Sequence, residues 1–412
     1  MVSFERFTLF NGLKVVVHED HTTPMAVVNI LYDVGARDED PEKTGFAHLF
    51  EHLMFGGSVH IPSYDEPLQR VGGENNAFTS NDITNYYIQV PAANIETAFW
   101  LESDRMLSLA FSEKSLEVQR NVVCEEFKQR YLNQPYGDVW LRLRPLAYKT
   151  HPYRWATIGE KLEHIEQATM EDVKSFFAKH YSPSNAIMVV AGAVKTDEVK
   201  ELAEKWFGPI PAGTRYHRQL PAEEPLTEER REVVRAQVPV SAIYIAFHME
   251  SRMEPSYYYA DLISDILSRG NSARLYRSLI KEQKLFSEIN AYLTGSLDKG
   301  LFVIEGKPVS GISMEQAEAA IWAELDKLKE ETVGPEELTK VQNKVESTMV
   351  FAEMSLLDKA MNLAYFELLG DAAQLNSETD RYLQVTAADL LEEARRIFQK
   401  TNASTLHYLA QP

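Results

Sequence analysis

The chain contains two halves in which the same order of predicted elements recurs, and this internal duplication constrains its fold more than any other feature. In the first half an apolar, strand-like stretch at 26–35 leads into a helical segment at 44–55. In the second half a similar stretch at 238–249 leads into a helical segment at 257–272. Repeats of this kind form related structural units. We therefore predict two similar domains.

The two helical segments carry the clearest match between the halves. Their apolar positions coincide in four pairs: Leu49 with Leu262, Phe50 with Ile263, Leu53 with Ile266, and Met54 with Leu267. Their polar positions differ, since the polar residues of the first segment, His48, Glu51 and His52, correspond to Asp261, Ser264 and Asp265. We expect both segments to be core helices and only the first to be built for metal binding.

A proline-rich segment separates the halves. The chain has 412 residues, which is too long for one ordinary hydrophobic core. The segment 208–230 carries four prolines and many charged residues between two apolar regions. This composition is typical of a linker, although a long surface loop inside one domain would share it. We place the linker at 211–230, which predicts an N-terminal domain at 1–210 and a C-terminal domain at 231–412.

Composition excludes several classes of protein. The single cysteine, Cys124, excludes an intramolecular disulfide and any cysteine-rich zinc site. The formal net charge of −19 argues against a nucleic-acid partner, because such binding depends on Lys and Arg neutralising phosphates. No apolar run approaches the roughly 20 residues of a membrane span, so we expect no membrane partner. The first residues lack the regions of a signal peptide. We expect a cytoplasmic protein, or a periplasmic one if a leader was removed.

An H-x-x-E-H motif, His48 to His52, lies in the first helical segment. Residues four apart share one face of a helix, so both imidazoles can point at one metal ion. Glu51 shares that face and can act beside the ion without ligating it. The motif is the inverted form of the H-E-x-x-H pattern of metalloproteases. It predicts a catalytic zinc site with a water position, in which Glu51 is the general base that takes a proton as water attacks a carbonyl.

The third zinc ligand must come from elsewhere, and the helical stretch at 112–132 offers two candidates. Glu126 lies three residues beyond Val123, which belongs to the apolar stripe of this stretch. Glu125 lies one step further round the helix. Spacing prefers Glu126 only mildly, and most acidic pairs on helices are simply solvated. The residue pattern alone therefore leaves the third ligand open.

The sequence resembles the family of inverted zinc peptidases that includes pitrilysin, insulin-degrading enzyme and mitochondrial processing peptidase. The resemblance covers nearly the whole chain and rests on five stretches: 48–58, 72–87, 119–126, 151–153 and 181–194. It implies an α+β fold of two homologous domains, each a mixed, mostly antiparallel β-sheet packed with helices. It also implies that the N-terminal domain is the catalytic, zinc-binding one and that the C-terminal domain is inactive. The family's third ligand corresponds to Glu126.

The resemblance further implies a metalloendopeptidase that hydrolyses peptides or unfolded protein segments. In such enzymes an extended peptide adds to a sheet edge near the zinc ion, and Asn76, Ala77 and Phe78 match that edge. Main-chain hydrogen bonds hold a peptide that binds in this way. One departure concerns Gln119, seven residues before Glu126, where the family usually has a glutamate. Gln119 can still hydrogen-bond but carries no charge.

A second departure concerns the grip on the substrate. Active members of the family often carry an arginine and a tyrosine seven residues apart in the second half. The matching positions here are Ile280 and Ser287, and a local realignment would offer Arg277 or Tyr292 instead. We therefore hypothesise a homologous partner subunit that supplies these residues, in a heterodimer or a homodimer. The alternative is a non-catalytic or partner-dependent subunit of a heteromeric complex similar to the processing peptidases.

Overall fold

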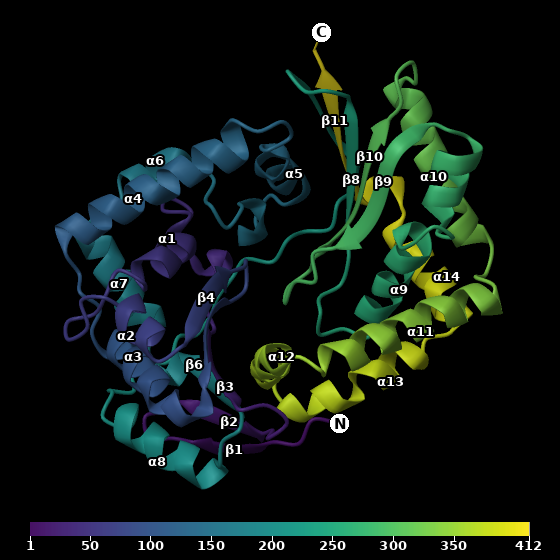
Figure 1. Ribbon diagram of the computed structural model, residues 1–412. Helices are drawn as coiled ribbons and strands as arrows, with labels where there is room; N and C mark the ends of the chain where they lie inside the picture. Colours follow the sequence, from purple (N-terminus) through teal and green to yellow (C-terminus); the bar gives the residue numbers. More distant parts are fainter. Residues whose placement is uncertain (412) are drawn as a thin grey trace. The chain divides into compact units, whose positions relative to one another are not determined.

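A computed structural model describes residues 1–411 as two compact units, and each unit contains one mixed β-sheet covered by helices (Figure 1). The first unit consists of Met1–Lys128, Trp155–Leu220 and Val350–Ser377. The second consists of Gln129–Arg154, Pro221–Met349 and the chain from Glu378 onward. Among the described residues, no helix combines the length and the apolar character needed to cross a membrane.

Both sheets are built from short strands. Those of the first sheet are β1 (Glu5–Thr8), β2 (Lys14–Glu19), β3 (Met25–Tyr32), β4 (Glu74–Thr79), β5 (Thr84–Pro91) and β6 (Ala186–Gly192). Those of the second are β7 (Arg230–Ala236), β8 (Ala242–His248), β9 (Phe286–Leu293), β10 (Leu301–Pro308) and β11 (Ala403–Ala410).

Helices fill the connections between the strands. Those in the first half of the chain are α1 (Phe46–Leu53), α2 (Asp65–Arg70), α3 (Ile95–Leu107), α4 (Glu113–Phe127), α5 (Val139–Ala147), α6 (Leu162–Glu166), α7 (Met170–His180) and α8 (Thr196–Trp206). Those in the second half are α9 (Ser256–Ser268), α10 (Met314–Glu330), α11 (Pro335–Ala352), α12 (Leu356–Leu368), α13 (Glu378–Leu383) and α14 (Ala387–Ile397).

The two sheets share one topology, which confirms the predicted duplication. The strand order is β1-β2-β6-β3-β5-β4 in the first sheet and β7-β11-β8-β10-β9 in the second. The parallel pairs are β2 with β6 and β7 with β11, and the other described neighbours are antiparallel. From β2 onward the orders are therefore equivalent, and β4 and β9 are the corresponding edge strands. α1 and α9 also correspond, and all eight apolar residues of the four predicted pairs are buried.

The units differ from the predicted domains in two segments. The chain passes from the first unit to the second after Leu220, inside the predicted linker at 211–230. However, residues 129–154 belong to the second unit and residues 350–377 to the first, so neither 1–210 nor 231–412 is a complete unit. The reason is that α5 packs on β7, β8 and β11, whereas α12 packs on β2, β3 and β6. The apolar period of a helix shows that it has a buried face but not which sheet that face covers.

We expect Leu363→Ala in α12 to lower the free energy of unfolding of the first unit by about 2–5 kcal/mol, because this side chain is fully buried against the first sheet. Leu383→Ala is the control, since Leu383 in α13 is 41% exposed and its loss should matter by less than about 0.5 kcal/mol. Urea denaturation followed by tryptophan fluorescence measures both. Equal losses in the two variants would contradict the packing of α12 on this sheet.

Candidate metal centre

The N-terminal end of α1, which carries the H-x-x-E-H motif, is held by a buried carboxylate. Gly45 precedes the helix with a φ of 88°, a conformation that favours glycine. Glu39 accepts hydrogen bonds from the backbone N–H groups of Gly45 and Ala47, each at 2.8 Å. A carboxylate at this end satisfies donors that have no partner within the helix. The position of α1 is therefore fixed about one turn before His48.

The structure brings His48, His52 and Glu126 together. One ligand atom from each of the three side chains lies within 4.8 Å of the other two. The Nε2 atoms of His48 and His52 lie 3.7 and 3.5 Å from Oε2 of Glu126. The two imidazole rings are almost perpendicular, with their centroids 4.8 Å apart. Within residues 1–411 no other group of three or more His, Cys, Asp or Glu side chains has this spacing.

These three side chains fit a zinc ion. Tetrahedral zinc, with bonds of about 2.0–2.2 Å to nitrogen and oxygen, places its ligand atoms about 3.3–3.6 Å apart. The observed separations of 3.5 and 3.7 Å lie close to that range. Two imidazoles and one carboxylate are also a common ligand set of catalytic zinc, in which a fourth position stays open to water or substrate.

The helix α4 presents Glu126, and not Glu125, to the two histidines. α4 packs against α1, and Val123 and Phe127 on α4 are both buried. Glu126 lies between them in the sequence and is half-buried. Glu125 is exposed and forms an ion pair of 2.9 Å with Lys128. The structure thus distinguishes Glu126 from Glu125, which the helical period alone left as similar candidates for the third ligand.

Gln119 occupies the position two turns before Glu126 on α4 and is half-buried. Two turns of a helix bring residues seven apart back to nearly the same face. Its side chain is therefore on the side of α4 that carries Glu126, where it brings an amide in place of a carboxylate. The site has one negative charge fewer than it would with a glutamate at this position.

Glu51 lies beside the three side chains without belonging to their group. Its Oε2 atom accepts a hydrogen bond of 2.6 Å from the hydroxyl group of Thr79. Burial raises the pKa of Glu51 above its ordinary value, the Thr79 hydrogen bond and His52 lower it, and Glu126 raises it. A half-buried carboxyl group with a raised pKa is suited to taking a proton from water and giving it to a leaving group.

The predicted substrate-binding residues Asn76, Ala77 and Phe78 lie in the middle of β4. β4 pairs with β5 on one side and ends the sheet on the other. The side chains of Asn76 and Phe78 are exposed, and α1 packs against this strand. An unpaired strand edge can accept an extended peptide through main-chain hydrogen bonds. The geometry thus places the edge strand β4 next to the helix that carries the histidines.

The second unit contains the residues that were compared with the family's substrate-binding arginine and tyrosine. Arg277 is exposed and 3.6 Å from Glu282, and Tyr292 on β9 donates a hydrogen bond of 3.2 Å to Glu305. Ser287 donates to a backbone carbonyl of β10. Each of these side chains therefore has a partner within its own unit.

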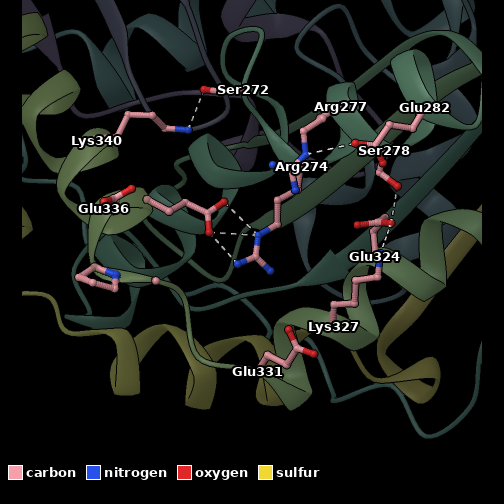
Figure 2. A pocket seen from close by; sticks show the side chains of 13 residues that line it. Ser272, Arg274, Arg277, Ser278, Glu282, Glu324, Lys327, Glu331, Glu336 and Lys340 are labelled. Atoms are coloured by element: carbon pink, nitrogen blue, oxygen red, sulfur yellow. Dashed lines mark hydrogen bonds and ion pairs between the residues drawn. The ribbon is translucent and has the colours of Figure 1, made fainter.

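Arg277 also lines a polar cleft of about 850 Å³ in the second unit (Figure 2). Two ion pairs lie in its lining, since Arg274 pairs with Glu337 and Lys327 with Glu324, each at 2.7 Å.

Sequence reasoning missed Glu39 and Thr79. The alternation of β4 places Thr79 on the same face as Ala77, but no pattern in the sequence shows that this face meets α1. Glu39 lies in the irregular segment before α1, so neither the helical nor the strand period relates its position to that of Ala47. The sequence does offer one signal, which is Gly45 directly before the helical segment. Glycine has no side chain to accept from the first N–H groups of a helix, so another residue must do so.

Comparisons with known proteins show which family the chain is similar to. Residues 14–152 match the family model described as insulinase, peptidase family M16, and residues 167–345 match the peptidase M16 inactive domain. The chain is 30% identical to the zinc protease PqqE of Helicobacter pylori over 98% of this chain and 92% of that protein. It is 27% identical to a probable mitochondrial-processing peptidase subunit beta of Arabidopsis thaliana, over 83% of this chain and 66% of that protein. A crystal structure of a protease from Helicobacter pylori matches with a TM-score of 0.93 and 29% identity, over the full length of both chains.

We expect Glu126→Gln to weaken zinc binding by more than about 100-fold, because even the loss of a residue that only supports a ligand costs roughly 10–100-fold. Glu125→Gln makes the same change of charge one residue away and should leave zinc affinity unchanged. Competition with a chromophoric chelator measures both affinities. If the two variants lose affinity equally, Glu126 is not the third ligand.

Proposed function

The chain belongs to the insulinase family, peptidase family M16, and on this premise we propose that it is a zinc-dependent endopeptidase that hydrolyses peptides or unfolded protein segments. The observation that carries the proposal is the convergence of His48, His52 and Glu126 with Glu51 at their side. Similarity to a protein named zinc protease supports zinc as the metal.

In the proposed reaction His48, His52 and Glu126 hold the ion, and Glu51 moves the proton. The chemistry that zinc supplies at such a site is Lewis acidity toward a carbonyl group and a water molecule. Glu51 takes the proton of the attacking water and passes it to the nitrogen of the leaving amine. The edge of β4 binds the peptide backbone and orients the scissile bond beside α1.

We further propose that full activity depends on a homologous partner subunit. Ile280 and Ser287 offer neither a guanidinium nor a phenol to hold a substrate. The similarity to a protein named as a processing-peptidase subunit supports an assembly, either a heterodimer or a homodimer. The similarity to a processing-peptidase subunit also favours a second candidate function, that of a subunit without activity of its own. The two experiments below separate the two functions.

The proposed location of the protein is the cytoplasm, or the periplasm if a leader precedes the mature chain. Nucleic acid and membrane are not among the proposed partners, in keeping with the charge of −19. Immunoblotting of fractionated cells tests the location.

We expect Glu51→Gln to lower kcat by about 10²–10⁴-fold, because glutamine keeps the shape of the side chain but cannot accept the proton. Its zinc content should stay at the wild-type level, and Glu125→Gln should keep wild-type kcat. In the wild-type protein 1,10-phenanthroline should abolish cleavage, and added zinc should restore it. Mass spectrometry of a digested peptide library reports cleavage. Full activity of Glu51→Gln, or indifference to the chelator, would exclude a zinc peptidase.

We expect the protein alone to cleave peptides slowly and a homologous subunit to raise kcat/KM by about tenfold or more, since a gripped substrate spends more time in a reactive position. Size-exclusion chromatography with light scattering, run beside the peptide assay, measures assembly and activity on the same fractions. A fully active monomer would contradict the need for a partner. Zero cleavage with every partner, by a zinc-loaded protein, would favour the subunit without activity.

A further inference from the structure

We propose that Thr79 is a positioning residue that holds Glu51 in place for proton transfer, and that the turn after β4 fixes Thr79 at that point. This inference rests on the proposed function, in which Glu51 is the general base. It assigns a role to a residue on the docking strand that is neither a metal ligand nor a peptide-binding residue.

The contact between the two side chains is short and direct. The hydroxyl group of Thr79 donates a short hydrogen bond of 2.6 Å to Oε2 of Glu51. Both side chains are half-buried. A glutamate side chain otherwise rotates about three bonds, and its terminal torsion is broad. With Oε2 bound by Thr79, the rotation of the carboxyl group is restrained.

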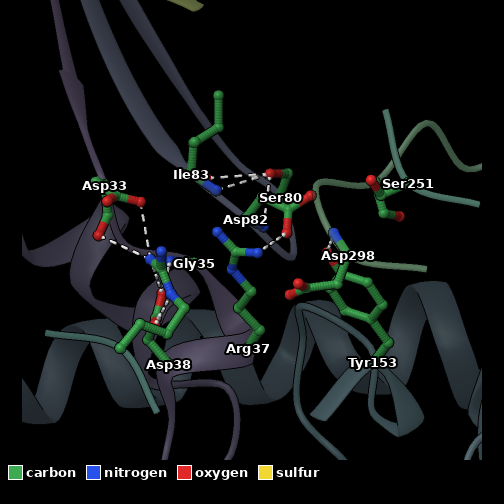
Figure 3. Close-up of polar contacts among 12 residues, drawn as sticks. Asp33, Gly35, Arg37, Asp38, Ser80, Asp82, Ile83, Tyr153, Ser251 and Asp298 are labelled. Carbon is green, nitrogen blue, oxygen red and sulfur yellow. Dashed lines mark hydrogen bonds and ion pairs between the residues drawn. The ribbon is translucent and has the colours of Figure 1, made fainter. Parts of the chain in front are cut away.

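Thr79 is in turn fixed because β4 ends in a tight turn directly after it. The backbone N–H of Ser80 donates to the carbonyl oxygen of Ile83 at 2.8 Å. The hydroxyl oxygen of Ser80 accepts from the N–H groups of Asp82 and Ile83, each at 3.0 Å (Figure 3). On the neighbouring strand Thr84 lies opposite Thr79. The hydrogen bonds of this turn leave the end of β4 little freedom to shift.

The turn is tied to the loop that leads to α1. Asp82 forms a buried ion pair of 3.2 Å with Arg37 (Figure 3). The N–H groups of Ala36 and Arg37 donate to the carbonyl oxygens of Ser80 and Asn81, at 3.1 and 2.9 Å. Removing one member of a buried pair would leave an uncompensated charge, so this connection resists opening.

Two residues after Arg37, the same loop contacts the start of α1 through Glu39. Glu39 accepts from the backbone at the start of α1, as described above. One loop therefore holds both the end of β4 and the beginning of α1. The distance between Thr79 and Glu51 is set from both sides, and a peptide bound along β4 is aligned with the general base by the strand that it pairs with. This arrangement predicts an effect on turnover rather than on substrate or metal binding.

The test compares three substitutions. Thr79→Val replaces the hydroxyl by a methyl group of similar size and should lower kcat by about 10–100-fold, a part of the 10²–10⁴-fold that a general base contributes. KM and zinc content should stay at wild-type values. Thr79→Ser keeps the hydroxyl and should recover most of the lost kcat. Thr22→Val is the matched control, because Thr22 donates a hydrogen bond of the same 2.6 Å to the carboxylate of Asp20. It should leave kcat unchanged.

Peptide affinity supplies a measurement that does not depend on turnover. Fluorescence anisotropy of a labelled peptide should give the same Kd for Glu51→Gln with and without Thr79→Val. A weaker Kd, a lower zinc affinity, or a failure of Thr79→Ser to recover kcat would show that Thr79 serves the fold and would overturn the positioning role.

A thermal double-mutant cycle separates this inference from the proposed function. Zinc-loaded Thr79→Val, Glu51→Leu and the double variant are compared with the wild-type protein. If Thr79 holds Glu51, the double variant should lose no more in Tm than the more affected single variant. Additive losses would overturn the inference even in an active enzyme. An inactive wild-type protein would overturn the proposed function, and the cycle would still decide whether Thr79 holds Glu51.

Discussion

The packing of α1 between an aromatic layer and the pair α4 and β4 is the constraint on which the candidate metal centre depends. On one side the ring of Phe50 stacks against that of Tyr181, with centroids 4.7 Å apart. The centroid of Phe176 in α7 lies 5.3 Å from that of Phe50. The helical period then turns His48 and His52 to the opposite side, where α4 supplies Glu126. Because one rigid helix carries both faces, a rotation that displaced the imidazoles would also expose Phe50. The apolar stripe therefore orients the ligands, and the free energy of burial keeps them oriented.

The corresponding helix of the second unit shows the same fold with other side chains at the positions of His48, Glu51 and His52. α9 keeps the apolar stripe, but its polar positions are satisfied by protein groups. Asp261 accepts a hydrogen bond of 2.6 Å from Tyr382, and Asp265 pairs with Arg269 at 3.2 Å. The phenol of Tyr382 and the guanidinium of Arg269 thus serve as the partners of these two carboxyl groups. The second unit shares the topology of the first, and its residues 221–345 lie within the match to the peptidase M16 inactive domain.

Much of this arrangement could be predicted, and what could not be predicted has a common cause. The H-x-x-E-H spacing and the two apolar stripes are periodic, and periodicity determines which side chains share a face. The choice of Glu126 over Glu125 required the family resemblance, because the two residues differ by only one step round α4. Glu39 and Thr79 act across loops and between elements, and no local pattern records such contacts. The packing of α5 and α12 was missed for the same reason, since a periodic stripe does not name the sheet that it covers.

The placement of α12 has a consequence for how the protein is made. The first sheet is synthesised early, and its last strand, β6, is complete at Gly192. One face of that sheet stays without its cover until residues 356–368 have left the ribosome. Domains generally fold from the N-terminus as synthesis proceeds, but this one must wait for nearly the whole chain. A nascent chain stopped at the linker would leave the apolar side chains of this sheet face without the helix that covers them in the folded protein.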